Sequence, residues 1–369
     1  MSSRNFQTYF DCGFSKIRAS VFNKNNQNES FYTESKFFTD HINLELEIQK
    51  IITSLEKDTN EYIDNINLMI DSPKMLSIGI SISKKLNGDK LTQANVQFLI
   101  QEAKQQISKN YTNHNITHII INNYIIDDID YSYFPDEINC HFISLDILFI
   151  CLPSDLVSDF KNIFSKFNIL INQIICSSYV KSINYKNNLG LTGHASFVDV
   201  GFNKTSIISY FNDKILSLDV LPIGGNHITK DISKIMEIDL DRSEKMKRNF
   251  DQNHKTLNDE NISLEILEKI IFARTEEILE LSAKFIKANL PTSDQFKMLV
   301  MGEGSKILDN HHKDKIFFSN DIDFLEETLE DICQSGFRYN DGLNKNEILV
   351  IPKKQIKHGL FEKIFQYFS

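Results

Sequence analysis

The chain has 369 residues, 41% of them hydrophobic, which is enough to bury a large core and predicts two or more domains. Lys and Arg number 40 against 50 Asp and Glu, and the net charge of −10 argues against nucleic acid as the main partner. Five scattered cysteines without a C-x-x-C pair predict neither a disulfide framework nor a zinc site and favour a reducing cytoplasm. The strongest apolar run, residues 142–152, is too short to span a membrane, and we expect no signal peptide.

The first predicted element is an Asp-x-Gly turn between two apolar runs. Residues 8–22 alternate in a way that predicts strand, tight turn and strand, with Asp11 and Gly13 in the turn. The same pattern, Asp-x-Gly-Phe-x-Lys, returns 188 residues later within residues 195–211. A repeat at this distance indicates two similar domains that open with the same hairpin, although Asp-x-Gly is also a common turn signal that can recur by chance.

Helices and strands are predicted to alternate between the two hairpins. In chain order they are a helix at 44–55, strands at 66–70 and 76–82, a helix at 91–107 capped by Thr92, strands at 117–126 and 140–152, a helix at 154–167 and a strand at 169–175. Pro73 marks a boundary, and residues 73–145 are expected to form a compact unit in which His118 and Tyr124 are ordinary strand residues. A polar linker at 184–193 leads to the second hairpin.

After the second hairpin, a strand at 215–221 leads to a helix that starts at a Gly224-Gly225 turn. Glycines at a helix start allow an anion to approach closely. The elements that follow are a charged helix near 243–247, a loop at 251–261, a helix at 264–286 and a strand at 299–301 that runs into a Gly302-x-Gly304 turn.

Two facing Asp-x-Gly turns have a physical use in nucleotide binding. Their N–H groups can close on a polyphosphate, the glycines let the backbone approach, and each aspartate can hold Mg²⁺ directly or through water. The sequence contains no G-x-x-x-x-G-K-[ST], G-x-S-x-G or H-E-x-x-H motif. His311 and His312 are interpreted as part of a surface turn rather than a metal site.

The last residues, 351–369, form a predicted amphipathic helix. Apolar side chains lie on one side of it, and a local charge of +3 favours an anionic lipid surface. The residues expected to contact the membrane are Lys357, Leu360, Phe361, Lys363, Ile364, Phe365 and Phe368. The alternative is a terminal helix that packs on the core.

The glycine turns resemble the motifs of the actin-like ATPases. Residues 11–16 resemble the first phosphate motif of that superfamily, residues 199–205 the second, and residues 301–305 the adenosine motif. Within the superfamily, residues 222–232 resemble the bacterial cell-division FtsA family in particular. Phe202, Asn203, Ser206 and Glu303 depart from the family pattern, which implies ATP binding with at most slow hydrolysis and no assigned catalytic residue.

This resemblance implies an α/β, actin-like fold of two duplicated RNase H-like domains with an inserted small α+β subdomain of the 1C type. The expected limits are 1–72 and 146–190 for domain 1A, 73–145 for 1C, 191–230 and 291–345 for domain 2A, 231–290 for 2B, and 346–369 for a linker and the membrane-targeting helix.

The resemblance also implies a site for ATP and Mg²⁺ between the two halves. Asp11 and Asp199 are the expected metal ligands, and Glu244 and Lys247 are expected at the ribose or adenine. The full predicted set is Asp11, Gly13, Ser15, Lys16, Asp199, Gly201, Asn203, Lys204, Thr205, Gly224, Gly225, Asn226, Glu244, Lys247, Gly302, Gly304 and Ser305.

The function implied by the resemblance is that of a cell-division scaffold on the cytoplasmic face of the bacterial inner membrane, at the septum. Such a protein tethers filaments of the tubulin-like FtsZ, binds the FtsZ C-terminal peptide, polymerises with itself and contacts later division proteins, with no role for nucleic acid. The main alternative is a sugar kinase-like or other actin-fold ATP-dependent enzyme, for which the sequence supplies no assignable catalytic aspartate. An actin-like chaperone would need a peptide-binding domain that we do not find.

Overall fold

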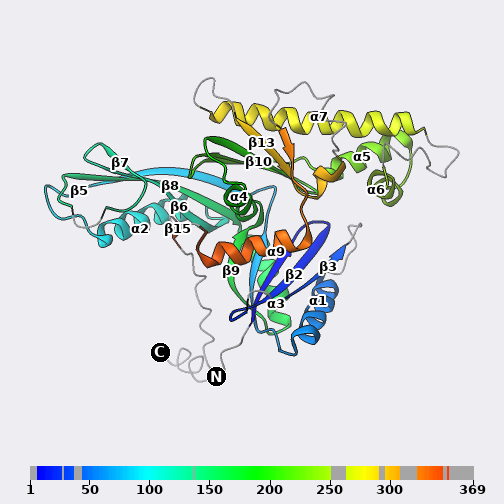
Figure 1. The fold of residues 1–369 in the computed structure, drawn as a ribbon, viewed down its shortest axis with the longest axis horizontal. Coiled ribbons are helices and arrows are strands. Elements are labelled where there is room, and N and C mark those ends of the chain that lie inside the picture. The colour runs from blue at the N-terminus through cyan, green and yellow to red at the C-terminus, as the bar shows by residue number, and fades with distance from the viewer. Residues whose placement is uncertain are drawn as a thin grey trace, which may run out of the picture.

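The computed structural model describes residues 6–26, 29–36, 44–135, 138–250, 263–290, 296–307, 322–343 and 347–348. In this part of the chain three β-sheets are flanked by helices, and the elements gather into lobes around a central pair of helices (Figure 1). No helix in the described ranges has the length and apolar character needed to cross a bilayer.

The first sheet has the strand order β3-β2-β1-β4-β9. Its strands are β1 (Phe6–Cys12), β2 (Lys16–Asn23), β3 (Ser30–Lys36), β4 (Asn65–Ile70) and β9 (Leu170–Cys176). The first three are antiparallel neighbours, and β4 and β9 continue the sheet in parallel. Helix α1 (Leu44–Thr59) buries Ile48, Ile51, Ile52 and Leu55 at helical spacing, and α3 (Ser154–Lys166) packs beside β9.

The second sheet repeats this order as β12-β11-β10-β13-β14. Its strands are β10 (His194–Val200), β11 (Thr205–Phe211), β12 (Lys214–Leu221), β13 (Lys297–Met301) and β14 (Ile322–Phe324). Again three strands pair antiparallel, and the last two are added in parallel. The same topology in both halves explains the repeated hairpin in the sequence.

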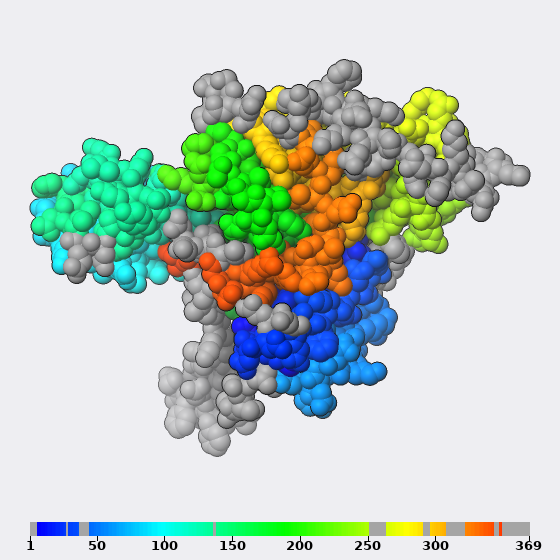
Figure 2. All heavy atoms as spheres, viewed as in Figure 1, coloured from blue at the N-terminus to red at the C-terminus, as the bar shows by residue number. Residues whose placement is uncertain are grey.

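A third sheet, inserted between β4 and α3, projects to one side of the molecule (Figures 1 and 2). It is built from β5 (Leu76–Lys85), β6 (His114–Ile126), β7 (Ile129–Tyr131) and β8 (Phe142–Pro153), with α2 (Gln93–Asn110) packed against β5. Leu99, Ala103, Ile143 and Phe149 are fully buried in a hydrophobic core of its own. This unit is therefore stabilised largely by its own contacts.

A short strand near the end of the chain completes this sheet. Residues 347–348, expected in a linker, form β15 (Glu347–Ile348), which pairs antiparallel with β6. The carboxylate of Glu347 lies 2.6 Å from Nδ1 of the buried His118, and the backbone N–H of Cys176 donates to Nε2 of the same ring at 2.8 Å. His118 of β6 therefore connects its own strand to β15 and to the end of β9, which is more than the ordinary strand role that we expected.

Helices α5 (Gly225–Met236) and α6 (Leu240–Arg248) form a lobe on the opposite side of the molecule with the first part of α7 (Leu264–Asn289), and the rest of α7 packs on the second sheet (Figure 1). Their shared core contains Ile228, Ile232, Met246, Leu267, Ile270 and Ile271. Arg274 of α7 pairs with Asp231 of α5, with Nε and Oδ2 2.7 Å apart, so its role is to join these two helices.

The central helices are α4 (Ser177–Asn188) and α9 (Leu329–Arg338), which pack against each other (Figure 1). We expected a polar linker at 184–193, and this prediction is wrong for its first five residues, because they form the last part of α4. Residues 177–186 are all buried, yet many of them are polar because their side chains pair inside the protein. For example, the side chain of Asn184 donates to Ser335 Oγ of α9 at 3.1 Å. A helix buried on every side has no apolar stripe, which is why periodicity did not reveal it.

Candidate functional site

The two Asp-x-Gly turns have the same backbone geometry. The N–H of Gly13 donates to the carbonyl of Lys16 at 2.9 Å, and the N–H of Gly201 donates to that of Lys204 at 2.8 Å. A Cβ on either glycine would lie 3.1 Å from that carbonyl oxygen, tighter than ordinary contact, so both turns favour glycine. Both turns line one cavity between the two halves of the molecule.

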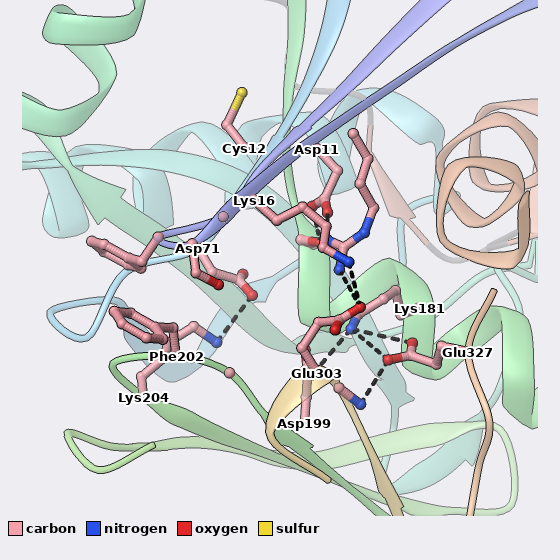
Figure 3. Close-up of a pocket in the computed structure, with 17 residues that line it drawn as sticks. Asp11, Cys12, Lys16, Asp71, Lys181, Asp199, Phe202, Lys204, Glu303 and Glu327 are labelled. Carbon is pink, nitrogen blue, oxygen red and sulfur yellow. Dashed lines mark hydrogen bonds and ion pairs between the residues drawn. The ribbon is translucent and has the colours of Figure 1, made fainter. Parts of the chain in front are cut away.

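Charged side chains dominate this cavity (Figure 3). Its lining contains four basic residues, Lys16, Arg18, Lys181 and Lys204, and five acidic residues, Asp11, Asp71, Asp199, Glu303 and Glu327. They come from both turns, from the end of β4, from α4 and from the segments after β13 and β14. Only four of these nine, Asp11, Lys16, Asp199 and Lys204, were predicted from the sequence as site residues.

Asp11, at the end of β1, is paired with its neighbour across the hairpin. Arg18 Nη1 lies 2.7 Å from Asp11 Oδ2, and Ser177 Oγ donates to Asp11 Oδ1 at 2.6 Å. Both oxygens of the carboxylate are therefore engaged. Burial alone would lower the pKa of Arg18, but the charges of Asp11 and Glu303 raise it above its usual value, so this side chain stays charged.

Asp199 occupies the equivalent position in the second turn and is paired with a residue of α4. Lys181 Nζ lies 3.0 Å from Asp199 Oδ1 and 3.3 Å from Glu327 Oε1. Burial alone would lower the pKa of Lys181, but the charges of Asp199 and Glu327 have the larger effect, so the pKa is raised. Burial raises the pKa of Glu327, which also accepts the N–H of Gly302 at 2.6 Å.

Three further ion pairs cross the cleft between the halves. Lys204 Nζ of the second turn lies 3.0 Å from Asp71 Oδ2, just after β4. Glu303, in the 3₁₀ turn η1 (Glu303–Ile307) after β13, lies 2.9 Å from Lys16 Nζ and 3.0 Å from Arg18 Nη2. Burial raises the pKa of Glu303, but Lys16 and Arg18 together lower it to about 2. The glutamate that interrupts the Gly302-x-Gly304 motif therefore binds the cations of the opposite half.

A second cavity, of about 290 Å³, adjoins the first and is lined by residues of both halves and of α5, α6 and η1. Ser15 and Lys16 line both cavities. Glu244 and Lys247 lie on its α6 wall, with Lys247 Nζ 2.6 Å from Glu244 Oε2 and 2.9 Å from the carbonyl of Gly225. Burial lowers the pKa of Lys247. Burial would raise the pKa of Glu244, but the neighbouring charge of Lys247 has the larger effect and lowers it.

The start of α5 rests directly on the second turn. The N–H of Gly225 donates to the carbonyl of Gly201 at 2.9 Å, and the N–H of Asn226 donates to that of Phe202 at 2.7 Å. A Cβ on Gly224 would lie 2.5 Å from the oxygen of Gly201, so only glycine fits there. These N–H groups hold the helix on the turn instead of pointing into a cavity.

The remaining predicted residues support the same corner. Asn226 Nδ2 donates to Asn203 Oδ1 at 2.9 Å, and Thr205 Oγ1 donates to the carbonyl of Ile223 at 2.7 Å. Gly302 has a φ of +96°, and Ser305 Oγ donates to its carbonyl at 2.7 Å. Gly304 packs against Val200 and lines the second cavity.

Asp11 and Asp199, the expected metal ligands, do not fit a directly bound Mg²⁺. Each carboxylate already has a buried cation within 3.0 Å, and a divalent ion at the same oxygens would have to displace it. Within the described ranges, no group of three or more His, Cys, Asp or Glu side chains is arranged to hold a metal ion. Both carboxylates form ion pairs with protein side chains, and the assignment of these two residues to a metal, held directly or through water, stays a prediction.

Three other predicted features lie outside the described residues: the membrane-contacting residues between 357 and 368, the loop at 251–261 and the histidines at 311 and 312. Among the described residues, sequence reasoning missed Arg18, Asp71, Lys181 and Glu327. Arg18 carried a signal, because a hairpin with this short turn places it opposite Asp11. The other three are brought in by elements that are distant in sequence.

Comparison with known proteins matches the second half of the chain to a cell-division family. Residues 196–340 match the family model described as Cell division protein FtsA. A curated cell division protein FtsA from Buchnera aphidicola subsp. Schizaphis graminum (strain Sg) is 23% identical over 211 residues, which cover 53% of this chain and 50% of that protein. The chain thus spans about half the length of that curated relative.

Solved structures show a similar architecture. The PilM-PilN type IV pilus biogenesis complex matches with a TM-score of 0.62 and 12% identity, covering 92% of this chain and 94% of that one. The ethanolamine utilization protein EutJ from Carboxydothermus hydrogenoformans matches with a TM-score of 0.51 and 10% identity, covering 91% of each chain. At such identities the likeness is one of fold, and it confirms the predicted actin-like fold.

Proposed function

We propose that this divergent, FtsA-like protein of actin-like fold binds ATP between its halves and anchors FtsZ filaments to the membrane during cell division. One observation carries the proposal. Two Asp-x-Gly turns that are far apart in the sequence line the same cavity at the junction of two sheets with the same strand order. The match of residues 196–340 to the FtsA family model supports the cell-division role.

In this proposal the nucleotide lies in the cavity of about 290 Å³ and extends toward the two turns. Glu244 and Lys247 contact the ribose or base, and Ser15 and Lys16 are near the phosphates because they line both cavities. The glycines of the two turns and of η1 let the backbone approach the phosphates. Lys204 supplies one more cation. Asn203, Thr205, Gly224, Asn226, Gly302 and Ser305 hold these turns in place.

Hydrolysis is slow in this proposal. A general base must be able to accept a proton from the attacking water. Of the carboxylates that line the first cavity, each is paired with a lysine or arginine: Asp11, Asp71, Asp199, Glu303 and Glu327. Burial raises the pKa of Glu303 and Asp71, but Lys16 with Arg18 and Lys204, respectively, outweigh burial and make these two carboxylates weaker bases. Burial raises the pKa of Glu327, but this carboxylate already accepts hydrogen bonds from the N–H of Gly302 and from Lys181.

The proposed partners rest on the likeness to FtsA and on the amphipathic sequence at 351–369. The FtsZ C-terminal peptide docks on the second half of the chain, and the protein assembles with itself into filaments at the septum. The lobe around residues 73–145 contacts neighbouring subunits or later division proteins. The terminal helix binds the cytoplasmic face of the inner membrane, weakly as one copy and firmly as part of a filament.

Titration calorimetry with ATP tests the nucleotide site. The double variant Lys247→Met with Glu244→Gln removes a buried cavity-lining pair together, and Arg248, the other partner of Glu244, has a side chain that is 31% exposed to solvent. We expect its dissociation constant for ATP to rise about tenfold or more, the scale of one lost charged contact. The matched control is Lys269→Met with Glu265→Gln, an exposed pair on α7 that should leave ATP affinity unchanged. A wild-type chain that binds no ATP, or a double variant that binds as well as the control, would contradict the proposal.

Co-sedimentation with anionic liposomes tests the membrane role separately. A chain truncated after Pro352 should lose sedimentation with the liposomes and keep its ATP affinity. Phe361→Glu combined with Phe365→Glu in the full chain should have the same effect, because two charges on the apolar face oppose insertion. A truncated chain that still sediments with the liposomes would mean that the terminal segment is not the anchor.

A further inference from the structure

We infer that Arg18 and Lys181 neutralise the two aspartates in place of a divalent cation, so that the protein binds its nucleotide without Mg²⁺. This inference rests on the proposed ATP site and concerns how that site neutralises phosphate. It follows from the ion pairs at the two aspartates, which engage Asp11 Oδ2 and Asp199 Oδ1 and place a protein cation beside each carboxylate.

The Lys181 ammonium is fixed in place by two carboxylates from the second half. Its Nζ lies 3.0 Å from Asp199 and 3.3 Å from Glu327, and only 7% of the Lys181 side chain is exposed. A divalent ion at Asp199 would either sit beside this ammonium, with strong like-charge repulsion, or expel it. Expelling it would leave Glu327 in the interior without its cation, which is costly.

The Arg18 guanidinium is held in the same way in the first half. Nη1 contacts Asp11, Nη2 contacts Glu303, and the side chain is 8% exposed. The second oxygen of Asp11 accepts the hydroxyl of Ser177 at 2.6 Å. Asp11 therefore has both oxygens engaged by groups that are themselves buried, and a metal ion there would have to share these oxygens with Arg18 and Ser177 or displace them.

Neutralisation of the phosphates requires positive charge from another source, and the second cavity supplies it. Five basic residues line that cavity against two acidic ones, and the basic set includes Lys36, Arg248 and Lys306. Of these two acids, Glu303 pairs with Lys16 and Arg18, and its side chain is 28% exposed on a short turn. A polyphosphate can therefore displace the Glu303 carboxylate from Lys16 and Arg18 and gain their charge.

The test is titration of the full chain with ATP in buffer that contains Mg²⁺ and, separately, in buffer that contains EDTA. We expect the two dissociation constants to agree within about twofold. Binding that weakens about tenfold or more in EDTA would overturn the inference and leave the ATP site standing. An absence of ATP binding in both buffers would sink the proposed function and, with it, the nucleotide part of this inference.

A second measurement tests the carboxylates without any nucleotide. Mn²⁺ is titrated into the apo protein and free Mn²⁺ is followed by electron paramagnetic resonance. We expect no Mn²⁺ site in the cleft of the wild-type chain. The variant Lys181→Met with Glu327→Gln removes the cation and one of its two acids together, which protects folding. This variant should gain a Mn²⁺ site. Adding Asp199→Asn should abolish that site. Lys186→Met, on the same helix and paired with the exposed Asp213, is the matched control and should gain none. Mn²⁺ binding by the wild-type chain that Asp199→Asn removes would overturn the inference.

Discussion

The two Asp-x-Gly turns share their backbone and differ in the residue that neutralises their carboxylate. In the strand pairing Arg18 stands opposite Asp11, whereas Ser206 occupies the same register position opposite Asp199. The first carboxylate is thus paired within its own hairpin. The second is paired by Lys181, which α4 brings from outside the hairpin.

This difference shows what a duplicated turn must keep and what it can change. The glycine in each turn is required by a carbonyl oxygen 3.1 Å from where a Cβ would lie, so its identity is fixed locally. A buried carboxylate requires only a cation within reach, and any element packed nearby can supply one. The backbone of a repeat can therefore stay the same while its charge partners move.

The largest effect is expected from breaking the second partnership. Lys181→Met leaves Asp199 and Glu327 buried without their shared cation, so the free energy of unfolding should fall by about 3–5 kcal/mol. Urea denaturation followed by circular dichroism measures this change. The control Lys186→Met removes a pair whose acid is exposed, and it should cost less than about 1 kcal/mol. Equal losses in the two variants would mean that Lys181 does not neutralise the second turn.

A smaller effect is expected where α5 meets the second turn. In Gly224→Ala the new Cβ would lie 2.5 Å from the Gly201 oxygen and 2.8 Å from the Lys204 nitrogen, both backbone atoms that cannot simply rotate away. We expect a loss of about 1–3 kcal/mol in the free energy of unfolding, the usual cost of overpacking. Gly79→Ala is the matched control because no heavy atom lies within 4 Å of its new Cβ. The packing of α5 on the turn would be refuted by equal stability of these two variants.

The smallest effect concerns Glu303, which reaches across to the first turn. Its pKa is lowered to about 2, so its stabilising contribution is present above about pH 4.5 and is lost as the pH falls toward 2. Glu303→Gln should therefore lower the free energy of unfolding by about 1–2 kcal/mol at pH 7, after allowance for its partial exposure. The difference between variant and wild type should shrink at pH 3. A difference that is the same at both pH values would show that Glu303 is not held by Lys16 and Arg18.

Much of the fold could be predicted from the sequence because it depends on local patterns. Both hairpins alternate apolar and polar residues around a glycine turn, and α5 starts at a glycine pair and has a clear apolar face. The repeated pattern at Asp11 and Asp199 indicated the duplication, which the identical strand orders bear out.

The parts that could not be predicted depend on contacts between distant segments. Helix α4 is polar in sequence because its side chains pair inside the protein, so its periodicity gives no signal. Lys181 reaches Asp199 only through the packing of that helix. Glu303 was recognised as a departure from a glycine motif, but its partners Lys16 and Arg18 lie more than 280 residues away in the chain.

The central claim is that protein cations, and not a metal ion, neutralise the two aspartates when the nucleotide is bound. A crystal structure of the full chain grown with ATP and MnCl₂, with anomalous data collected for manganese, tests it most directly. We predict nucleotide density beside the two turns, Lys181 still within about 3 Å of Asp199, and no manganese peak at either aspartate. A manganese peak bonded to Asp11 or Asp199, with Arg18 or Lys181 displaced, would contradict the account.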